Sequence, residues 1–193
     1  LTQITAEYIL SQKINYLCIG FMTFKDSKFS WTMTNGCKTN YSNMLPELKK
    51  LHDAGVCITA SIGGEGSGSF MANITTDYQS YYDSFITIRA SLDNILDGID
   101  FDIEAEEDDH YPALGEFING ISGIFKTNKY VVTIAATPMQ LTPGCGGNVS
   151  GNGATVNNLR NVDMSLIDGV MLQWYEGGSQ NGNSGQSPLT IDG

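Results

Sequence analysis

Basic residues are scarce in this chain. Its 193 residues contain 10 Lys and Arg against 21 Asp and Glu, which gives a formal net charge of −11 and a pI near 4.3. Duplex nucleic acid and anionic membrane surfaces are bound through clustered Lys and Arg, so the composition argues against both partners. The chain also lacks any run of about 18 apolar residues, so we expect no membrane insertion. Residues 1–10 lack the basic and apolar regions of a signal peptide, as a mature or trimmed chain also would.

Cysteine and histidine are also few, which limits metal and thiol chemistry. The four cysteines lie at 18, 37, 57 and 145, and no pair has the C-x-x-C spacing of a metal site. Cys18 and Cys57 lie inside apolar runs, which is typical of buried free thiols. Cys37 and Cys145 lie in Gly-rich loops that permit a disulfide, although sequence cannot assign the pairing. Neither histidine has a plausible nucleophile or metal partner, and we expect no metal and no cofactor.

Strand-like and helix-like segments alternate along the chain. Apolar runs predict strands at 15–24, 56–62, 98–104, 130–136 and 169–175, and helical spacing predicts helices at 43–54, 77–92, 111–125 and, short and irregular, 156–166. Repeated β–α–β units with near-continuous apolar strands predict a parallel sheet, covered by helices and with its strands in chain order. No composition break divides the chain, so we expect one domain over residues 1–193. The length is short of the about 250 residues of a complete eight-fold β/α barrel.

The most informative segment is L-D-G-I-D-F-D-I-E, which begins at Leu96. Asp100, Asp102 and Glu104 occupy alternate positions of a predicted strand, so their three carboxylates share one face. The opposite face, beneath the helices, takes the apolar residues Ile99, Phe101 and Ile103. Three buried acids are costly unless they share protons or hydrogen bonds, which points to a function.

Two other interpretations of the acidic strand fit less well. A solvated face of an open antiparallel sheet fits poorly, because the flanking strands read as buried on both sides. A Ca²⁺ or Mg²⁺ site needs oxygen ligands around the ion, whereas alternate residues of one strand form a line.

Three motifs carry a family resemblance. The segment from Asp97 to Glu104 resembles the D-x-x-D-x-D-x-E signature of glycoside hydrolase family 18, the chitinases. Ser61-Ile62-Gly63-Gly64 is similar to the S-x-G-G that ends the third barrel strand of the family. Gln173-Trp174-Tyr175 is similar to the Q-[FY]-Y that ends the sixth strand, as in plant-type class III chitinases. The motifs stand in the family's order over residues 15–176, so the resemblance implies a (β/α)8 TIM barrel with strands two to six recognisable and strands one, seven and eight without a counterpart.

The resemblance also implies roles for the acidic residues. Glu104 would be the general acid that protonates the glycosidic oxygen and later takes a proton from water. The substrate's own N-acetyl oxygen would attack the anomeric carbon, which is the substrate-assisted variant of glycoside hydrolysis. Asp102 would orient the acetamido N–H, Asp100 would share a proton or hydrogen bond with Asp102, and Tyr175 would bind the acetamido oxygen.

Further residues are assigned by the same resemblance. The substrate pocket would be lined by Phe21, Gly63, Gly64, Gln173 and Trp174. Asp97 lies three residues before Asp100, so it faces away and is interpreted as structural. The acidic run 106–109 is interpreted as a solvated loop.

The implied function is a glycosidase that cleaves β-1,4-linked N-acetylglucosamine polymers such as chitin with retention. The alternatives are an endo-β-N-acetylglucosaminidase that acts on N-glycans and a non-catalytic chitin-binding lectin. The presence of Glu104 favours catalysis, because non-catalytic relatives commonly lose it. Three N-x-[ST] triplets, at Asn40, Asn73 and Asn148, favour a secreted glycoprotein.

Overall fold

The structure is a computed structural model that describes residues 5–31, 41–64, 74–103, 111–136 and 161–172. Its helices are α1 (Ala6–Ser11), α2 (Tyr41–Asp53), α3 (Tyr78–Ser91), α4 (Tyr111–Thr127) and the 3₁₀ helix η3 (Met164–Leu166). Its strands are β1 (Tyr16–Lys25), β2 (Lys28–Ser30), β3 (Cys57–Gly64), β4 (Gly98–Ile103), β5 (Val131–Ala136) and β6 (Gly169–Leu172).

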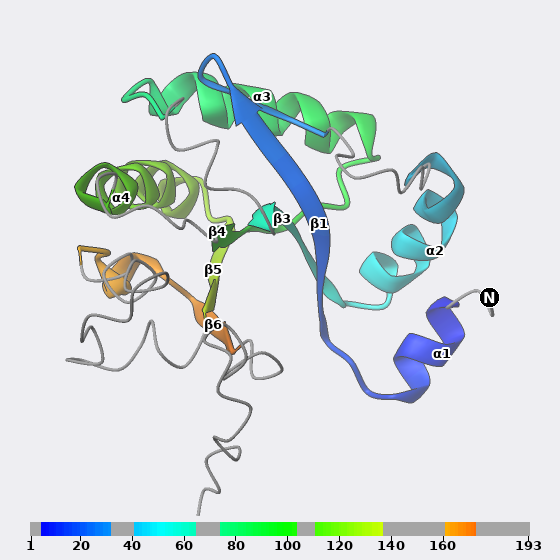
Figure 1. Ribbon diagram of the computed structural model, residues 1–193. Coiled ribbons are helices and arrows are strands. Elements are labelled where there is room, and N and C mark those ends of the chain that lie inside the picture. Colours follow the sequence, from blue (N-terminus) through cyan, green and yellow to red (C-terminus); the bar gives the residue numbers. More distant parts are fainter. Residues whose placement is uncertain (1–4, 32–40, 65–73, 104–110, 137–160, 173–193) are drawn as a thin grey trace, which may run out of the picture.

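The described strands form one sheet in the order β2-β1-β3-β4-β5-β6. Strands β1, β3, β4, β5 and β6 are parallel, and each pairs with the one that follows it in this order. The predicted strand order and direction are therefore confirmed. In Figure 1, α2, α3 and α4 lie in an arc around one side of these strands, as expected for β–α–β units.

Two short elements were not predicted from the sequence. Helix α1 precedes the sheet, and β2 forms an antiparallel hairpin with β1. Lys25 pairs with Lys28 across a two-residue turn in which Asp26 and Ser27 have φ angles of 52° and 59°. Two successive positive φ angles characterise a type I′ turn, which usually carries Asn-Gly, so Asp-Ser gave no hairpin signal. Of the irregular helix predicted over 156–166, the described part contains only η3.

A cluster of aromatic rings fixes the helices on the sheet. Phe24 of β1, Tyr81 of α3 and Phe117 of α4 are buried together, with ring centroids 5.2 Å apart for Phe24–Phe117 and for Tyr81–Phe117. Burying such a side chain stabilises the fold by about 1.5–3 kcal/mol. Tyr81 and Phe85 of α3 are both fully buried, so the aromatic face of this helix belongs to the core.

The predicted register of β4 is also confirmed. Ile99, Phe101 and Ile103 are buried in the hydrophobic core, and the Phe101 ring lies 6.2 Å from that of Phe117 on α4. Alternation then places Asp100 and Asp102 on the opposite side of the strand. We call that side of the sheet, which faces away from the helices, the inner face.

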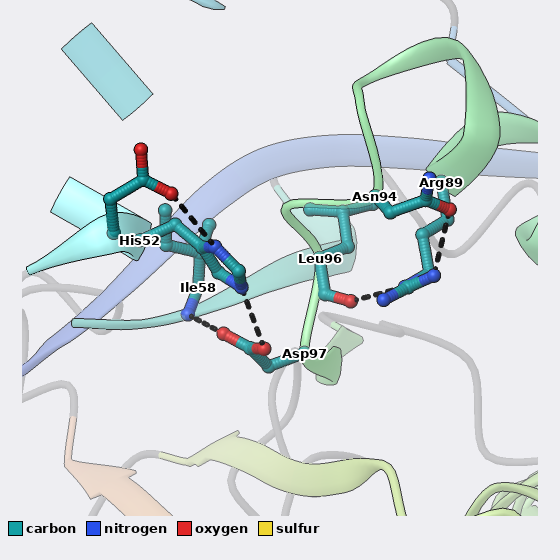
Figure 2. A network of polar contacts seen from close by, with 7 residues as sticks. His52, Ile58, Arg89, Asn94, Leu96 and Asp97 are labelled. Atoms are coloured by element: carbon teal, nitrogen blue, oxygen red, sulfur yellow. Dashed lines mark hydrogen bonds and ion pairs between the residues drawn. The ribbon is translucent and has the colours of Figure 1, made fainter. Parts of the chain in front are cut away.

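The start of β4 is tied to β3 by Asp97. Its Oδ2 accepts a hydrogen bond of 2.8 Å from the Ile58 backbone N–H, and its Oδ1 lies 3.3 Å from His52 Nε2 at the end of α2 (Figure 2). The Asp97 N–H in turn donates to the Ile58 carbonyl at 2.7 Å. Asp97, at the start of β4, therefore fastens the start of β3 to the end of α2, which agrees with its interpretation as a structural residue.

Asp168 repeats this arrangement at the start of β6. Its Oδ2 accepts from the Val132 N–H at 2.9 Å, and its Oδ1 accepts from Lys126 Nζ at the end of α4. Partial burial raises the pKa of Asp168, but the hydrogen bonds from Lys126 and Val132 outweigh that effect and lower it overall. The same pair of contacts thus closes two β–α–β units at the N-terminal edge of the sheet.

Arg89 holds the end of α3 against this edge. Its Nε donates to the Leu96 carbonyl and its Nη1 to Asn94 Oδ1, each at 2.8 Å (Figure 2). The guanidinium also lies over the Tyr130 ring, 5.7 Å from its centroid.

None of the described helices combines the length and the apolar character needed to cross a membrane.

Candidate active site

The carboxylate of Asp100 is held from both flanking strands. Ser61 of β3 and Thr133 of β5 pair directly with Asp100 in the sheet register. Ser61 Oγ donates to Oδ2 at 2.9 Å, and Thr133 Oγ1 donates to Oδ1 at 2.6 Å. Asp100 is only 2% exposed, so these hydroxyls replace the water that its carboxylate loses on burial.

A tyrosine hydroxyl lies next to Thr133 on the inner face. The Tyr16 hydroxyl of β1 is 2.5 Å from Thr59 Oγ1 and 2.7 Å from Thr133 Oγ1, so the ring reaches across the inner face from β1 to β5. Burial raises the pKa of Tyr16 above its usual range, although the hydrogen bonds with Thr133 and Thr59 oppose this effect. Tyr16 is therefore a protonated phenol at neutral pH.

Asp102 lies two residues after Asp100 in β4, on the same face and closer to the C-terminal edge of the sheet. It is 8% exposed and pairs with Gly63 of β3. Gly63 has a φ of 119°, and a Cβ there would lie 2.1 Å from the Asp102 carbonyl oxygen. Only glycine permits this approach, so Gly63 determines how closely β3 lies against the acidic strand.

Phe21 and Gly64 lie at the same edge. Gly64 has a φ of 81°, and a Cβ there would lie 2.9 Å from the Phe21 ring. Phe21 is 43% exposed, near a register shift between Ile19 and Met22 in the pairing of β1 with β3. The structure thus brings Phe21, Gly63 and Gly64 to the edge at which barrel enzymes place their chemistry.

Cys18 corrects one prediction. It is a free cysteine, as expected, but it is exposed rather than buried, and Cys57 is half-buried. The apolar run around Cys18 alternates between faces, so Ile19 enters the core while Cys18 lies on the inner face beside Thr59. Desolvation by the surrounding strands and the charge of Asp100 raise the pKa of Cys18 to about 12, so the thiol is neutral and a poor nucleophile.

Several predicted residues lie outside the described part of the chain. They are Glu104, Gln173, Trp174 and Tyr175 of the predicted site, the sequon residues Asn40, Asn73 and Asn148, and the loop cysteines Cys37 and Cys145. Their roles stay predictions.

The sequence interpretation missed the hydroxyl groups around Asp100. It placed Ser61 in the S-x-G-G motif without a contact to Asp100 and assigned nothing to Tyr16, Thr59 or Thr133. A signal was present, because Thr59 and Ser61 alternate in β3 as Asp100 and Asp102 do in β4. The long-range reach of Tyr16 to β5 has no local sequence signal.

The chemistry of the inner face is that of carboxyl and hydroxyl groups. Among the described residues, no group of three His, Cys, Asp or Glu side chains could hold a metal ion. Buried carboxyls that are oriented by hydrogen bonds can transfer protons and stabilise a developing positive charge. A parallel sheet that is covered by helices on one side and carries such groups on the other is the arrangement of a β/α barrel.

The sequence comparison identifies the family. The sequence model of the glycosyl hydrolases family 18 matches residues 2–147, and the chain belongs to this family.

Two curated relatives are plant proteins. The acidic endochitinase of Cicer arietinum is 38% identical over 97 residues, which cover 46% of this chain and 31% of that protein. The acidic endochitinase SE2 of Beta vulgaris is 31% identical over 145 residues, which cover 71% of this chain and 44% of that protein. The matched parts of this chain thus span less than half the length of either relative.

Solved structures show the same fold. A chitinase from Chromobacterium violaceum has a TM-score of 0.66 at 12% identity, covering 90% of this chain and 52% of its own. Human YKL-39, described as a pseudo-chitinase with retained chitooligosaccharide binding, has a TM-score of 0.55 at 16% identity, covering 69% of this chain and 38% of its own. The fold is therefore the TIM barrel, of which the described residues supply five parallel strands with their helices.

Proposed function

We propose that the intact protein hydrolyses β-1,4-linked N-acetylglucosamine polymers by substrate-assisted catalysis with retention of configuration. The observation that carries this proposal is the row of Asp100 and Asp102, both buried on the inner face of β4. Continued alternation would place Glu104 next in the row, at the C-terminal edge. Membership of family 18 and the similarity to two acidic endochitinases support the same substrate class.

Each acid takes a different part of the reaction. Glu104 protonates the leaving oxygen and afterwards deprotonates the attacking water. Asp102 orients the acetamido group, whose oxygen attacks the anomeric carbon, and stabilises the positive charge that develops on it. Asp100, fixed by Ser61 and Thr133, shares a proton or hydrogen bond with Asp102.

The remaining predicted residues bind the sugar. Tyr175 hydrogen-bonds the acetamido oxygen, and Gln173 and Trp174 line the same pocket. Phe21 offers an exposed aromatic surface beside Gly64, against which a sugar ring can pack. The reaction needs no cofactor, because the protein supplies acid–base groups and the substrate supplies the nucleophile.

The decisive experiment replaces the general acid in the intact protein. Gln keeps the size of Glu but cannot donate the proton, so Glu104→Gln should lower turnover of N-acetylglucosamine oligomers by about 10²–10⁴-fold while binding persists. Glu116→Gln, at an exposed position of α4, is the matched control and should keep wild-type turnover. Full activity of Glu104→Gln would contradict the mechanism.

The same assay separates the alternatives. Binding of the oligomers by the wild type without any turnover would select the lectin. Release of N-glycans from glycoproteins without cleavage of chitin oligomers would select the endo-β-N-acetylglucosaminidase.

We also infer that residues 1–193 belong to one catalytic domain and that the protein is secreted. The second inference rests on the sequons at Asn40, Asn73 and Asn148. Treatment of the natural protein with an N-glycanase should lower its mass, and an unchanged mass would remove this support.

A further inference from the structure

The hydroxyl groups behind Asp100 have a single consistent direction of donation. Thr133 has one hydroxyl proton and donates it to Asp100 Oδ1 at 2.6 Å. Its oxygen is therefore the acceptor in the 2.7 Å contact with the Tyr16 hydroxyl, which must donate. The one proton of Tyr16 is then used, so Thr59 donates in the 2.5 Å contact with Tyr16.

The result is a chain of three donors that runs Thr59, Tyr16, Thr133 and ends on one oxygen of Asp100. Its members come from β3, β1 and β5, so the chain crosses the inner face. Thr59 and Thr133 are fully buried, and Tyr16 is half-buried. Serial hydrogen bonds polarise one another, so each donor strengthens the next.

The chain has a counterpart on the other oxygen of the carboxylate. Ser61 of β3 donates to Oδ2, while Thr133 of β5 donates to Oδ1. Donors on opposite neighbouring strands bind the two oxygens, which fixes the rotation of the carboxyl group. Removal of the chain would leave Oδ2 with Ser61 and Oδ1 without its hydroxyl donor, so the whole carboxyl group would be less firmly fixed.

We propose that Tyr16, acting through Thr133 and supported by Thr59, is a positioning residue that fixes the orientation of the Asp100 carboxyl for the reaction. This inference rests on the proposed function, in which Asp100 must present a defined oxygen to Asp102. Tyr16 lies behind Asp100, at the start of β1, and touches Asp100 only through Thr133. Its effect should therefore appear in turnover rather than in substrate binding.

The position of each hydroxyl in the chain predicts a graded series. In the intact protein, Thr133→Val removes a bond to a charged group and should lower kcat by about 30-fold. Tyr16→Phe removes a bond between neutral groups one step away and should lower kcat by about five-fold, and Thr59→Val by about two-fold. KM should stay within about two-fold throughout, because no substrate contact is lost.

Two variants separate positioning from packing. Thr133→Ser keeps the hydroxyl and should retain nearly wild-type kcat, whereas a packing role would slow Thr133→Ser, which loses the methyl, more than Thr133→Val, which keeps the size of Thr. Tyr8→Phe, at an exposed position of α1, removes a tyrosine hydroxyl outside the chain and should change nothing. A Tyr16→Phe variant with wild-type kcat, or with a raised KM and unchanged kcat, would overturn the proposal.

A second measurement is independent of activity. The ¹³C resonance of the Asp100 side-chain carboxyl should move most in Thr133→Val, less in Tyr16→Phe, least in Thr59→Val, and not in Tyr8→Phe. If the wild type turned over no substrate, the proposed function would fail, yet this series would still test the chain. An Asp100 resonance unmoved by Tyr16→Phe would refute the positioning role in either case.

Discussion

The N-terminal edge and the inner face of the sheet hold carboxylates in opposite ways. At the N-terminal edge, Asp97 binds a backbone N–H and lies beside His52, and Asp168 of the neighbouring unit pairs with a backbone N–H and Lys126. Three residues along the same strand, Asp100 is more deeply buried and accepts hydrogen bonds from neutral hydroxyls. Within the described part of the chain, no cation pairs with it.

This difference separates stability from chemistry. A carboxylate that binds a backbone N–H and a basic side chain at a helix end fastens strand starts to helix ends. A carboxylate held by neutral donors such as the hydroxyls of Ser61 and Thr133 is oriented without being paired with a cation, so its charge stays available to a substrate. The comparison therefore predicts that the N-terminal edge controls the free energy of unfolding and that the inner face controls turnover.

The largest expected effect comes from Gly63, near the end of β3, and Gly55, which precedes the strand, is its control. Gly63→Ala would place a Cβ 2.1 Å from the Asp102 carbonyl oxygen, so β3 or β4 must move. We expect a loss of at least about 3 kcal/mol in the free energy of unfolding and loss of turnover. Gly55→Ala, with a φ of 88° but no atom within 4 Å, should cost only about 1–2 kcal/mol and keep kcat. Denaturant unfolding and kinetic assays of both variants test this, and equal losses would contradict it.

The next effect compares two aspartates of one segment. Asp100→Asn should lower kcat by about 10²-fold, yet leave stability unchanged or raise it, because a buried charge is removed. Asp97→Ala leaves the Ile58 N–H without its acceptor and should cost about 1–3 kcal/mol of stability with kcat unchanged. Unfolding in urea beside kinetics measures both quantities. A loss of stability in Asp100→Asn, or of turnover in Asp97→Ala, would contradict the separation of stability at the N-terminal edge from turnover on the inner face.

A smaller effect concerns acid. Partial burial raises the pKa of Asp168 in the folded protein, but the hydrogen bonds from Lys126 and Val132 outweigh this effect and lower the pKa overall. Folding therefore gains stability from Asp168 above the pKa of the unfolded chain, and this gain disappears as the pH falls through the lower folded value. Asp168→Asn should be less stable at neutral pH and show a smaller loss of stability between pH 5 and 2. Thermal unfolding at several pH values measures this, and parallel profiles would contradict it.

The smallest effect concerns Cys18. Cys18 is exposed on the inner face, but its pKa of about 12 keeps it protonated at pH 8. Its alkylation by iodoacetamide should be about 10²-fold slower than that of free cysteine, and Cys18→Ala should keep kcat within about two-fold. Peptide mapping by mass spectrometry assigns the modified residue. Rapid alkylation of Cys18 would show that its thiol is activated.

The parts of this architecture that depend on local periodicity were predictable. Alternation in β4 gave the opposite faces of Asp100 and Phe101, and the apolar runs gave five strands in the right order. The hairpin to β2 was not predictable, because Asp26 and Ser27 lack the usual turn residues. The contacts of Asp168 with Val132, and of Tyr16 with Thr133, join residues 36 and 117 positions apart, so only the assembled sheet reveals them.

The central claim is that carboxylates of the inner face cleave the substrate through its own acetamido group. The most direct test follows the intact protein and an N-acetylglucosamine oligomer by ¹H NMR and records the anomer of the newly formed reducing end. The substrate-assisted mechanism predicts that the β-anomer appears first and that deacetylated oligomers are not cleaved. Initial release of the α-anomer, or rapid cleavage of the deacetylated oligomers, would contradict it.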